Sequence, residues 1–125
     1  MRLLLDTHAY IWLRVEPARV PPKTRSSVAE ADLVLVSAVS GWEIELKVAS
    51  GKLRPIGTFG DGMRDSGYVE LPVYGRHVDA LRELPQHHHR DPFDRMLVAQ
   101  ARAEGATLVT ADRDIRAYAV PTMWE

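Results

Sequence analysis

Asp6, Glu43, Asp94 and Asp112 have the side-chain chemistry of a cation site, and their spacing allows a folded sheet to bring them together. Carboxylates held close together repel one another and raise one another's pKa values, so an all-acid cluster implies a bound cation that neutralises it. Oxygen ligands favour Mg²⁺ or Mn²⁺ over zinc. Such an ion, or a pair about 4 Å apart, activates water and stabilises the charge of a displacement at phosphorus. The acids therefore predict phosphodiester hydrolysis.

Each acid taken alone also has an ordinary structural explanation. Asp6 and Asp94 suit helix caps or partners of a helix dipole. Glu43 suits a solvated helix face, and Asp112 suits a turn. It is the joint placement of the four that favours a metal site over these separate explanations.

Three short apolar runs predict the strands that position these acids. Residues 2–5, 33–36 and 107–110 lack polar alternation, which is typical of strands buried on both faces of a parallel sheet. We expect a further short strand within 68–73 and helices over 9–13, 23–31, 42–48, 77–84 and 92–104. Residues 52–67 are rich in glycine; short helical turns are possible there, but no element is predicted. Strands that alternate with helices indicate an α/β fold with a parallel sheet covered on both faces.

This arrangement predicts where the acids lie. Ligands of open parallel sheets bind beyond the carboxyl ends of the strands. Asp6 directly follows the first strand, Ser37 follows the second, and Asp112 comes soon after the last. Glu43 falls about two turns into the helix after Ser37, and Asp94 falls in the first turn of the helix before the last strand. The four acids are therefore expected at one edge of the sheet.

The bulk composition indicates one folded domain over residues 1–125. The chain is 46% hydrophobic and 26% charged, with a net charge of −1, so any nucleic-acid site must be a local patch. It has no cysteine, which excludes disulfides, thiolate metal sites and thiol nucleophiles. No stretch reaches membrane-spanning length, and we expect a cytoplasmic protein without membrane association.

Four segments of the sequence resemble the PIN-domain ribonucleases, and specifically the VapC-type toxins of toxin–antitoxin pairs. The segments are LLDTH at 4–8, SAVSGWEI at 37–44, HRDPFDRMLVAQA at 89–101 and LVTAD at 108–112. They occur in the order of the family, and the resemblance covers essentially the whole chain.

The resemblance implies a three-layer α/β/α sandwich with a central parallel sheet and Mg²⁺-dependent (or Mn²⁺-dependent) hydrolysis of RNA by water. It also implies a homodimer inhibited by a VapB-type antitoxin. Asp6 and Asp94 would hold the principal metal, while Glu43 and Asp112 would complete its water shell or hold a second ion. By position in the family pattern, the supporting polar neighbours are Thr7, Ser37 and Thr110. Asp91 and Asp114 stand close to Asp94 and Asp112 in sequence, and their share in the site is left open.

Three other features of the sequence invite functional explanations. His87, His88 and His89 are adjacent on an expected loop and more often lie in solvent than hold a transition metal, although the family pattern allows His89 to pack beside the active-site helix. Arg95 could meet a phosphate or the antitoxin, but an exposed arginine is more often solvated. Aromatic rings could stack on bases; we expect Trp42 to pack against protein, and Trp12 is left open.

Two alternatives to an active ribonuclease were weighed. A receiver-like phosphotransfer domain also gathers acids at a sheet edge, but it requires a lysine after a late strand, where this chain has Thr110-Ala111-Asp112. A catalytically silent PIN-fold module would act through a protein partner or by masking RNA. The four intact acids favour activity without proving turnover.

Overall fold

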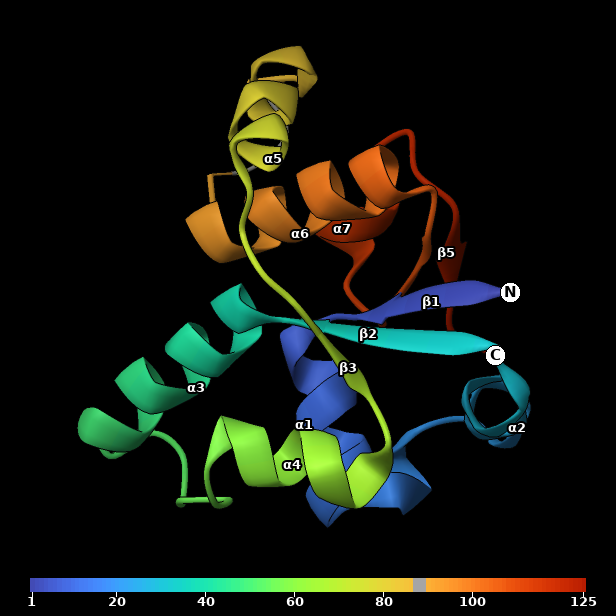
Figure 1. Cartoon of the computed structure of the whole chain (residues 1–125), viewed down its shortest axis with the longest axis vertical. Helices are drawn as coiled ribbons and strands as arrows, with labels where there is room; N and C mark the ends of the chain where they lie inside the picture. Colours follow the sequence, from blue (N-terminus) through green and yellow to red (C-terminus); the bar gives the residue numbers. More distant parts are fainter. Residues whose placement is uncertain (87–89) are drawn as a thin grey trace.

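The computed structural model describes residues 1–86 and 90–125, and it contains a five-stranded, all-parallel sheet (Figure 1). The strand order is β3-β2-β1-β4-β5, so the first strand lies at the centre. In the register, Leu4 of β1 lies beside Leu35 of β2 and Leu108 of β4. The strand bounds are β1 Arg2–Leu5, β2 Leu33–Ser37, β3 Val69–Leu71, β4 Thr107–Val109 and β5 Thr122–Met123.

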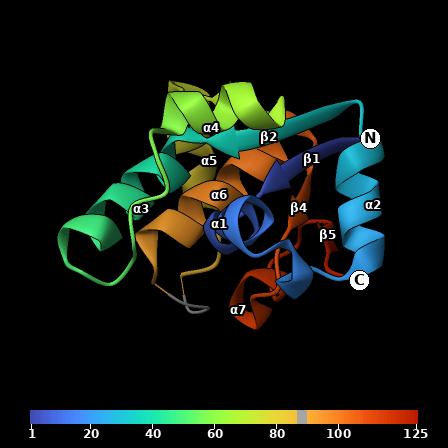
Figure 2. The same ribbon diagram turned by 90° about the horizontal axis from the view of Figure 1, so that it is seen from below.

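Helices cover both faces of this sheet, as Figures 1 and 2 show. On one side lie α5 (Gly75–Ala80), α6 (Pro92–Glu104) and α7 (Arg113–Arg116). On the other lie α1 (Thr7–Val15), α2 (Pro22–Glu30), α3 (Ala38–Ala49) and α4 (Phe59–Ser66). Short 3₁₀ turns follow α1 at Pro17–Arg19 and α5 at Leu81–Glu83. The expected three-layer α/β/α sandwich is confirmed.

The central strand is apolar from Leu3 to Leu5 because both of its faces are buried there. Side chains alternate along a strand, so Leu4 joins the core beneath α6 while Leu3 and Leu5 join the core beneath α1. All three leucines are fully buried. This double burial explains why the sequence shows a continuous apolar run in place of an alternating one.

Two elements were absent from the sequence prediction. Helix α4 falls in the glycine-rich stretch 52–67, where Gly60 and Gly62 lower the intrinsic helix propensity. Gly62 is required there because a Cβ atom would collide with the Tyr10 hydroxyl. Strand β5 has two residues and extends the sheet beyond β4, which is too short for a periodicity to appear.

Other boundaries differ from the prediction by part of a turn or more. Helix α3 begins at Ala38, four residues before the expected start, because the Ser37 side chain caps it. The expected helix over 77–84 is α5 followed by a 3₁₀ turn. His87, His88 and His89 lie outside the described residues. No helix in the described part of the chain is long and apolar enough to cross a membrane.

Candidate active site

The carboxyl ends of β1, β2 and β4 meet at one edge of the sheet, on the left in Figure 1. Asp6 follows β1 directly and caps α1. Ser37 ends β2 and caps α3, while Asp112 follows β4 and caps α7. Each strand therefore delivers a polar residue to the same edge, where the adjoining helix begins.

Asp6 is the most deeply buried of the four acids, with 4% of its surface exposed. Its Oδ1 accepts a hydrogen bond from the Ala9 amide at 2.7 Å. Burial raises the pKa of this carboxyl, and the nearby Asp112 adds to the rise; hydrogen bonds from Thr110 and Ala9 act against it. Asp6 is thus both the helix cap that ordinary structure suggested and a buried acid facing the site.

The expected supporting residues hold the site's elements together. The Thr7 hydroxyl donates to Ser40 Oγ at 3.0 Å, which joins α1 to α3 in a buried contact. Ser37 Oγ accepts from the Val39 amide at 3.0 Å. Thr110 hydrogen-bonds to the Asp6 side chain, and its hydroxyl oxygen accepts from the Asp112 amide at 3.0 Å. Thr110 therefore positions two of the acids directly, while Thr7 and Ser37 fix the helices beside them.

Glu43 is also buried, with 7% of its surface exposed, so it is not a solvated helix residue. One carboxylate oxygen, Oε2, lies 3.2 Å from Lys47 Nζ. The other, Oε1, has no hydrogen-bond partner in the described part of the chain. Lys47 was missed as a site residue, although its position four residues after Glu43 is the spacing at which helical side chains pair.

Asp94 is the acid on which the other carboxylates converge. It lies half-buried in the first turn of α6, whose cap is Asp91. Its pKa is raised to about 7, first by burial and then by the negative charges of the surrounding acids, which are Asp91, Asp112, Glu43 and Asp6. The structure therefore brings the other three expected acids within electrostatic reach of Asp94.

The two acids left open by the sequence behave differently. Asp91 accepts a hydrogen bond from the Asp94 amide at 3.0 Å and contributes more to the raised pKa of Asp94 than any other charge. Asp114 is exposed and is not among the charges that act on Asp94. Its amide instead donates to Asp112 Oδ1 at 2.8 Å, so it belongs to the cap of α7.

The site suits a hydrated divalent cation. Within residues 1–86 and 90–125, no three acidic or histidine side chains lie close enough to hold one ion together. Mg²⁺ commonly keeps several waters and uses only one or two carboxylates. The unpartnered Glu43 Oε1 and the charge crowding at Asp94 are the features that a cation would relieve. The oxygen-only donor set therefore fits such an ion.

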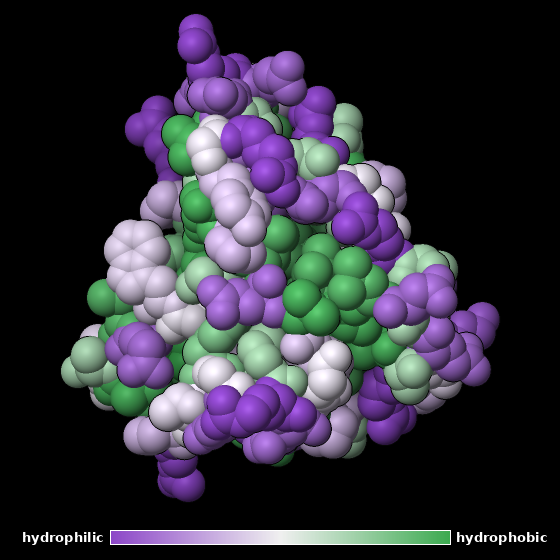
Figure 3. All heavy atoms as spheres, viewed as in Figure 1, coloured by the Kyte–Doolittle hydropathy of each residue, from purple (hydrophilic) through white to green (hydrophobic). Residues whose placement is uncertain are grey.

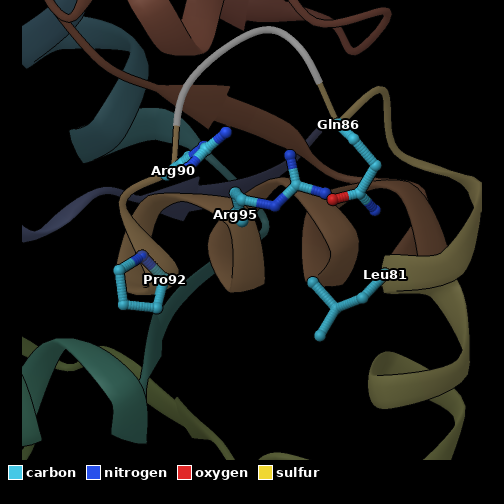
Figure 4. Close-up of a pocket in the computed structure, with 5 residues that line it drawn as sticks. All are labelled: Leu81, Gln86, Arg90, Pro92 and Arg95. Atoms are coloured by element: carbon cyan, nitrogen blue, oxygen red, sulfur yellow. The ribbon is translucent and has the colours of Figure 1, made fainter.

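The Arg95 side chain forms hydrogen bonds within this protein. Its Nη1 donates to the Pro85 carbonyl at 2.8 Å and to Tyr118 Oη at 3.0 Å. Figure 4 shows its guanidinium directed toward Gln86, in a recess of about 460 Å³ that Leu81, Arg90 and Pro92 also line. A role in anchoring the segment before α6 accounts for this side chain better than phosphate binding.

Trp42 packs against this protein on one side of its ring only. It is 62% exposed, and its ring meets Phe93 edge-on at 5.1 Å between centroids. This contact bridges α3 and α6 beside Glu43 and Asp94. The expected packing against protein is therefore found on one side of the ring, and packing of its exposed side in an interface between copies stays a prediction.

Comparisons with known proteins show which family the chain resembles. The PIN-domain family model matches residues 3–121. The chain is 29% identical to ribonuclease VapC22 of Mycobacterium tuberculosis over 132 aligned positions, which cover 98% of each protein.

Solved structures share the fold at lower identity. The VapBC2 complex of Rickettsia felis, bound to a promoter DNA fragment, has a chain that aligns with a TM-score of 0.72 and 14% identity, covering all of both chains. A toxin–antitoxin complex from Klebsiella pneumoniae gives a TM-score of 0.67 and 15% identity over 97% of this chain and 95% of that one. FitAcB of Neisseria gonorrhoeae gives a TM-score of 0.59 and 21% identity, over 97% of this chain and 96% of that one. These likenesses show the α/β/α arrangement.

Proposed function

This chain belongs to the PIN-domain family, and on that premise we propose that residues 1–125 form a single-domain ribonuclease that requires a divalent cation and acts as the toxin of a toxin–antitoxin pair. The observation that carries the proposal is the convergence of Glu43, Asp6 and Asp112 on the half-buried Asp94. Supporting it, the near-full-length relative from Mycobacterium tuberculosis is itself a ribonuclease. We propose that the cation is Mg²⁺ and that Mn²⁺ can replace it.

The chain's own side chains prepare the site for charge. Asp6 and Asp94 would hold the principal ion, with Glu43 and Asp112 completing its surroundings. When bound, the cation supplies an activated water and stabilises the negative charge that develops at phosphorus. Thr110 fixes the Asp6 carboxyl by hydrogen bonding, and the cap made by Asp91 fixes the start of α6. Lys47 holds Glu43 Oε2, and Oε1 has no hydrogen-bond partner among the described residues.

Metal dependence is tested with purified, partner-free protein and a mixed single-stranded RNA substrate. We expect cleavage in Mg²⁺ and its loss in EDTA, with recovery when excess Mg²⁺ or Mn²⁺ is restored. Cleavage that persists unchanged in EDTA would exclude the proposed chemistry. Absence of cleavage in every tube, together with RNA binding, would favour the silent binding module instead.

We place the antitoxin in a groove along α3. The groove has a volume of about 600 Å³ and runs between α3 and the segment that leads into α4. Its lining is largely apolar and includes Trp42, Val48, Pro55 and Phe59. A VapB-type protein with an apolar segment would fill this groove and cover the exposed ring of Trp42. Coexpression with a candidate antitoxin tests this: Trp42→Asp should abolish co-purification, and retention of the partner would argue for another surface.

A second copy of the chain is proposed to cover the apolar side of β3 and α5. Figure 3 shows hydrophobic side chains gathered in the middle of this face, over the β2–β3 side of the sheet. Along it, Val69, Val73, Tyr74 and Val78 are each 41–50% exposed. Contiguous exposed apolar side chains of this kind mark association surfaces.

We expect Val78→Asp to convert a dimer into a monomer, because an unpaired carboxylate would have to be buried twice in a symmetric interface. The dimer dissociation constant should rise by at least about a hundredfold, which corresponds to about 2.7 kcal/mol. Analytical ultracentrifugation measures it. Val15→Asp is the matched control, since Val15 is 55% exposed on the opposite layer. If both variants remain dimeric, the interface lies elsewhere.

A further inference from the structure

A small recess opens beside the acids, between α1 and the turn that leads into α7. It has a volume of about 250 Å³ and is lined by Asp6, His8, Trp12, Ala111 and Asp112. Two of its walls therefore differ in kind: one carries the carboxylates of the proposed active site, and the other carries aromatic rings. The sequence alone left the role of Trp12 open.

The aromatic wall is built on one face of α1. His8 and Trp12 are four residues apart, the spacing that stacks side chains along a helix, and their ring centroids lie 5.7 Å apart at an angle of 45°. Trp12 is held from two directions. The Arg19 guanidinium lies 4.2 Å from the centre of its ring, and Trp124 approaches to 5.7 Å.

The rings of this wall are held in place before any ligand binds, which favours binding. Because Trp12 is clamped by Arg19 and Trp124, a ligand that stacks on this wall does not have to immobilise it. His8 is exposed and presents a planar ring to the recess. Ala111 offers only a methyl group on the side of the β4–α7 turn, which leaves room for a flat group.

We propose that this recess binds one nucleobase of single-stranded RNA, next to the phosphate held at the acids, by stacking on the His8–Trp12 wall. The inference rests on the proposed ribonuclease function and adds the subsite that fixes the substrate. Aromatic stacking holds bases of any sequence, since every base has a π-face. The neighbouring acids repel phosphates unless a cation is present, and a chain with a net charge of −1 does not attract RNA as a whole. Contact with a base would therefore provide attraction that the charges do not.

The proposal is tested by equilibrium binding of short fluorescein-labelled RNA to the full chain carrying Asp94→Asn, in Mg²⁺, followed by fluorescence anisotropy. The same RNA with abasic nucleotides serves as the matched ligand. In this background, His8→Ala and Ala111→Leu should each weaken binding of intact RNA by about 5-fold to about 150-fold, the equivalent of about 1–3 kcal/mol for one stacked base. Neither should change binding of abasic RNA, and His8→Phe should restore the affinity for intact RNA.

Two further variants separate this recess from other surfaces. Val15→Ala lies on the same helix but is not part of the recess lining, and it should bind like the parent. Trp42→Ser removes an exposed ring on α3 that does not line the recess, and it should also leave the base-dependent part of binding intact.

The outcomes distinguish this inference from the function on which it rests. Intact and abasic RNA that bind equally, or base-dependent binding lost only in Trp42→Ser, would overturn the recess while leaving the ribonuclease function standing. No binding of either RNA, with no cleavage by the wild-type chain, would overturn both. Loss of base-dependent binding in His8→Ala and Ala111→Leu together supports the recess.

Discussion

Asp94→Asn is expected to abolish RNA cleavage while making the metal-free protein more stable at neutral pH. Replacement of groups that merely orient metal ligands lowers activity by about 10-fold to about 100-fold, so loss of a central carboxylate should exceed about a hundredfold. The gain in stability follows from the charges around Asp94, since the substitution removes a negative group that faces Asp91, Asp112 and Glu43.

The stability effect has a defined dependence on pH. In the folded protein the pKa of Asp94 is about 7, whereas the unfolded chain releases this proton near the ordinary value of 3.8. Between these values the folded state binds more protons than the unfolded state, so the free energy of unfolding falls as pH rises. The loss is complete above pH 7, and it is absent below the unfolded pKa, where both states are protonated.

The magnitude is accessible to thermal melts in EDTA. After allowance for the solvent contact of this half-buried carboxyl, about 1–2 kcal/mol is expected at pH 8, or roughly 3–10 °C in Tm. Wild type should lose this stability between pH 4 and pH 8, and Asp94→Asn should lose much less. Asp114→Asn is the control, because Asp114 is exposed and does not act on Asp94.

Added Mg²⁺ should reverse the order of the two proteins. A cation that binds only the folded state raises Tm in proportion to the logarithm of its concentration. Wild type should gain stability with Mg²⁺ and Asp94→Asn should gain little. Equal shifts in the two proteins would place the ion away from Asp94, and an unaltered cleavage rate in Asp94→Asn would remove this acid from the chemistry.

The sequence predicts the position of these acids because the positions depend on strand ends. Asp6 and Asp112 follow runs whose apolar character is unambiguous, and a parallel sheet brings such ends to one edge. Glu43 is placed by the helix that Ser37 begins. In each case a local sequence pattern predicts the strand or helix that carries the acid. The parallel order of the strands then brings acids that are distant in sequence to the same edge.

Other parts of the site depend on contacts that local patterns do not encode. The recess needs α1 to meet the β4–α7 turn and Trp124 from the far end of the chain to meet Trp12. Helix α4 is hard to predict because Gly62 is required by a distant neighbour, the Tyr10 hydroxyl, at a position where helix propensity disfavours glycine. Burial of Glu43 likewise depends on the packing of α3 against α6, so its sequence neighbours do not reveal it.

His77→Ala is expected to cause the largest loss of stability outside the sheet. The His77 side chain is fully buried on α5 and joins three partners. Its Nδ1 accepts from the Tyr74 amide at 3.0 Å and lies 3.4 Å from Gln100 Nε2, and its Nε2 lies 2.8 Å from Glu104 Oε2. The network requires the tautomer with hydrogen on Nε2, so the ring donates to Glu104 on α6.

Alanine would leave a cavity and remove the partner of several polar groups. Glu104 retains Arg76, whose Nη2 donates at 2.7 Å, but the buried amide of Gln100 loses a contact. Cavity formation and unpaired polar groups together cost about 3–5 kcal/mol, a large part of the roughly 5–15 kcal/mol that stabilises a domain. His77→Gln, which can still donate to Glu104, should recover part of the loss.

Urea denaturation measures this free energy, with Asp79→Ala as the control. Asp79 lies on the same helix but is exposed, so its replacement should change stability by less than about 0.5 kcal/mol. Because His77 is absent from the lining of the recess and from the charges that act on Asp94, the folded fraction of His77→Ala should cleave RNA at the wild-type rate. A loss of under about 1 kcal/mol would mean that α5 is held to α6 by its apolar contacts alone, whereas lost cleavage in protein that remains folded would show that the α5–α6 contact also sets the position of Asp94.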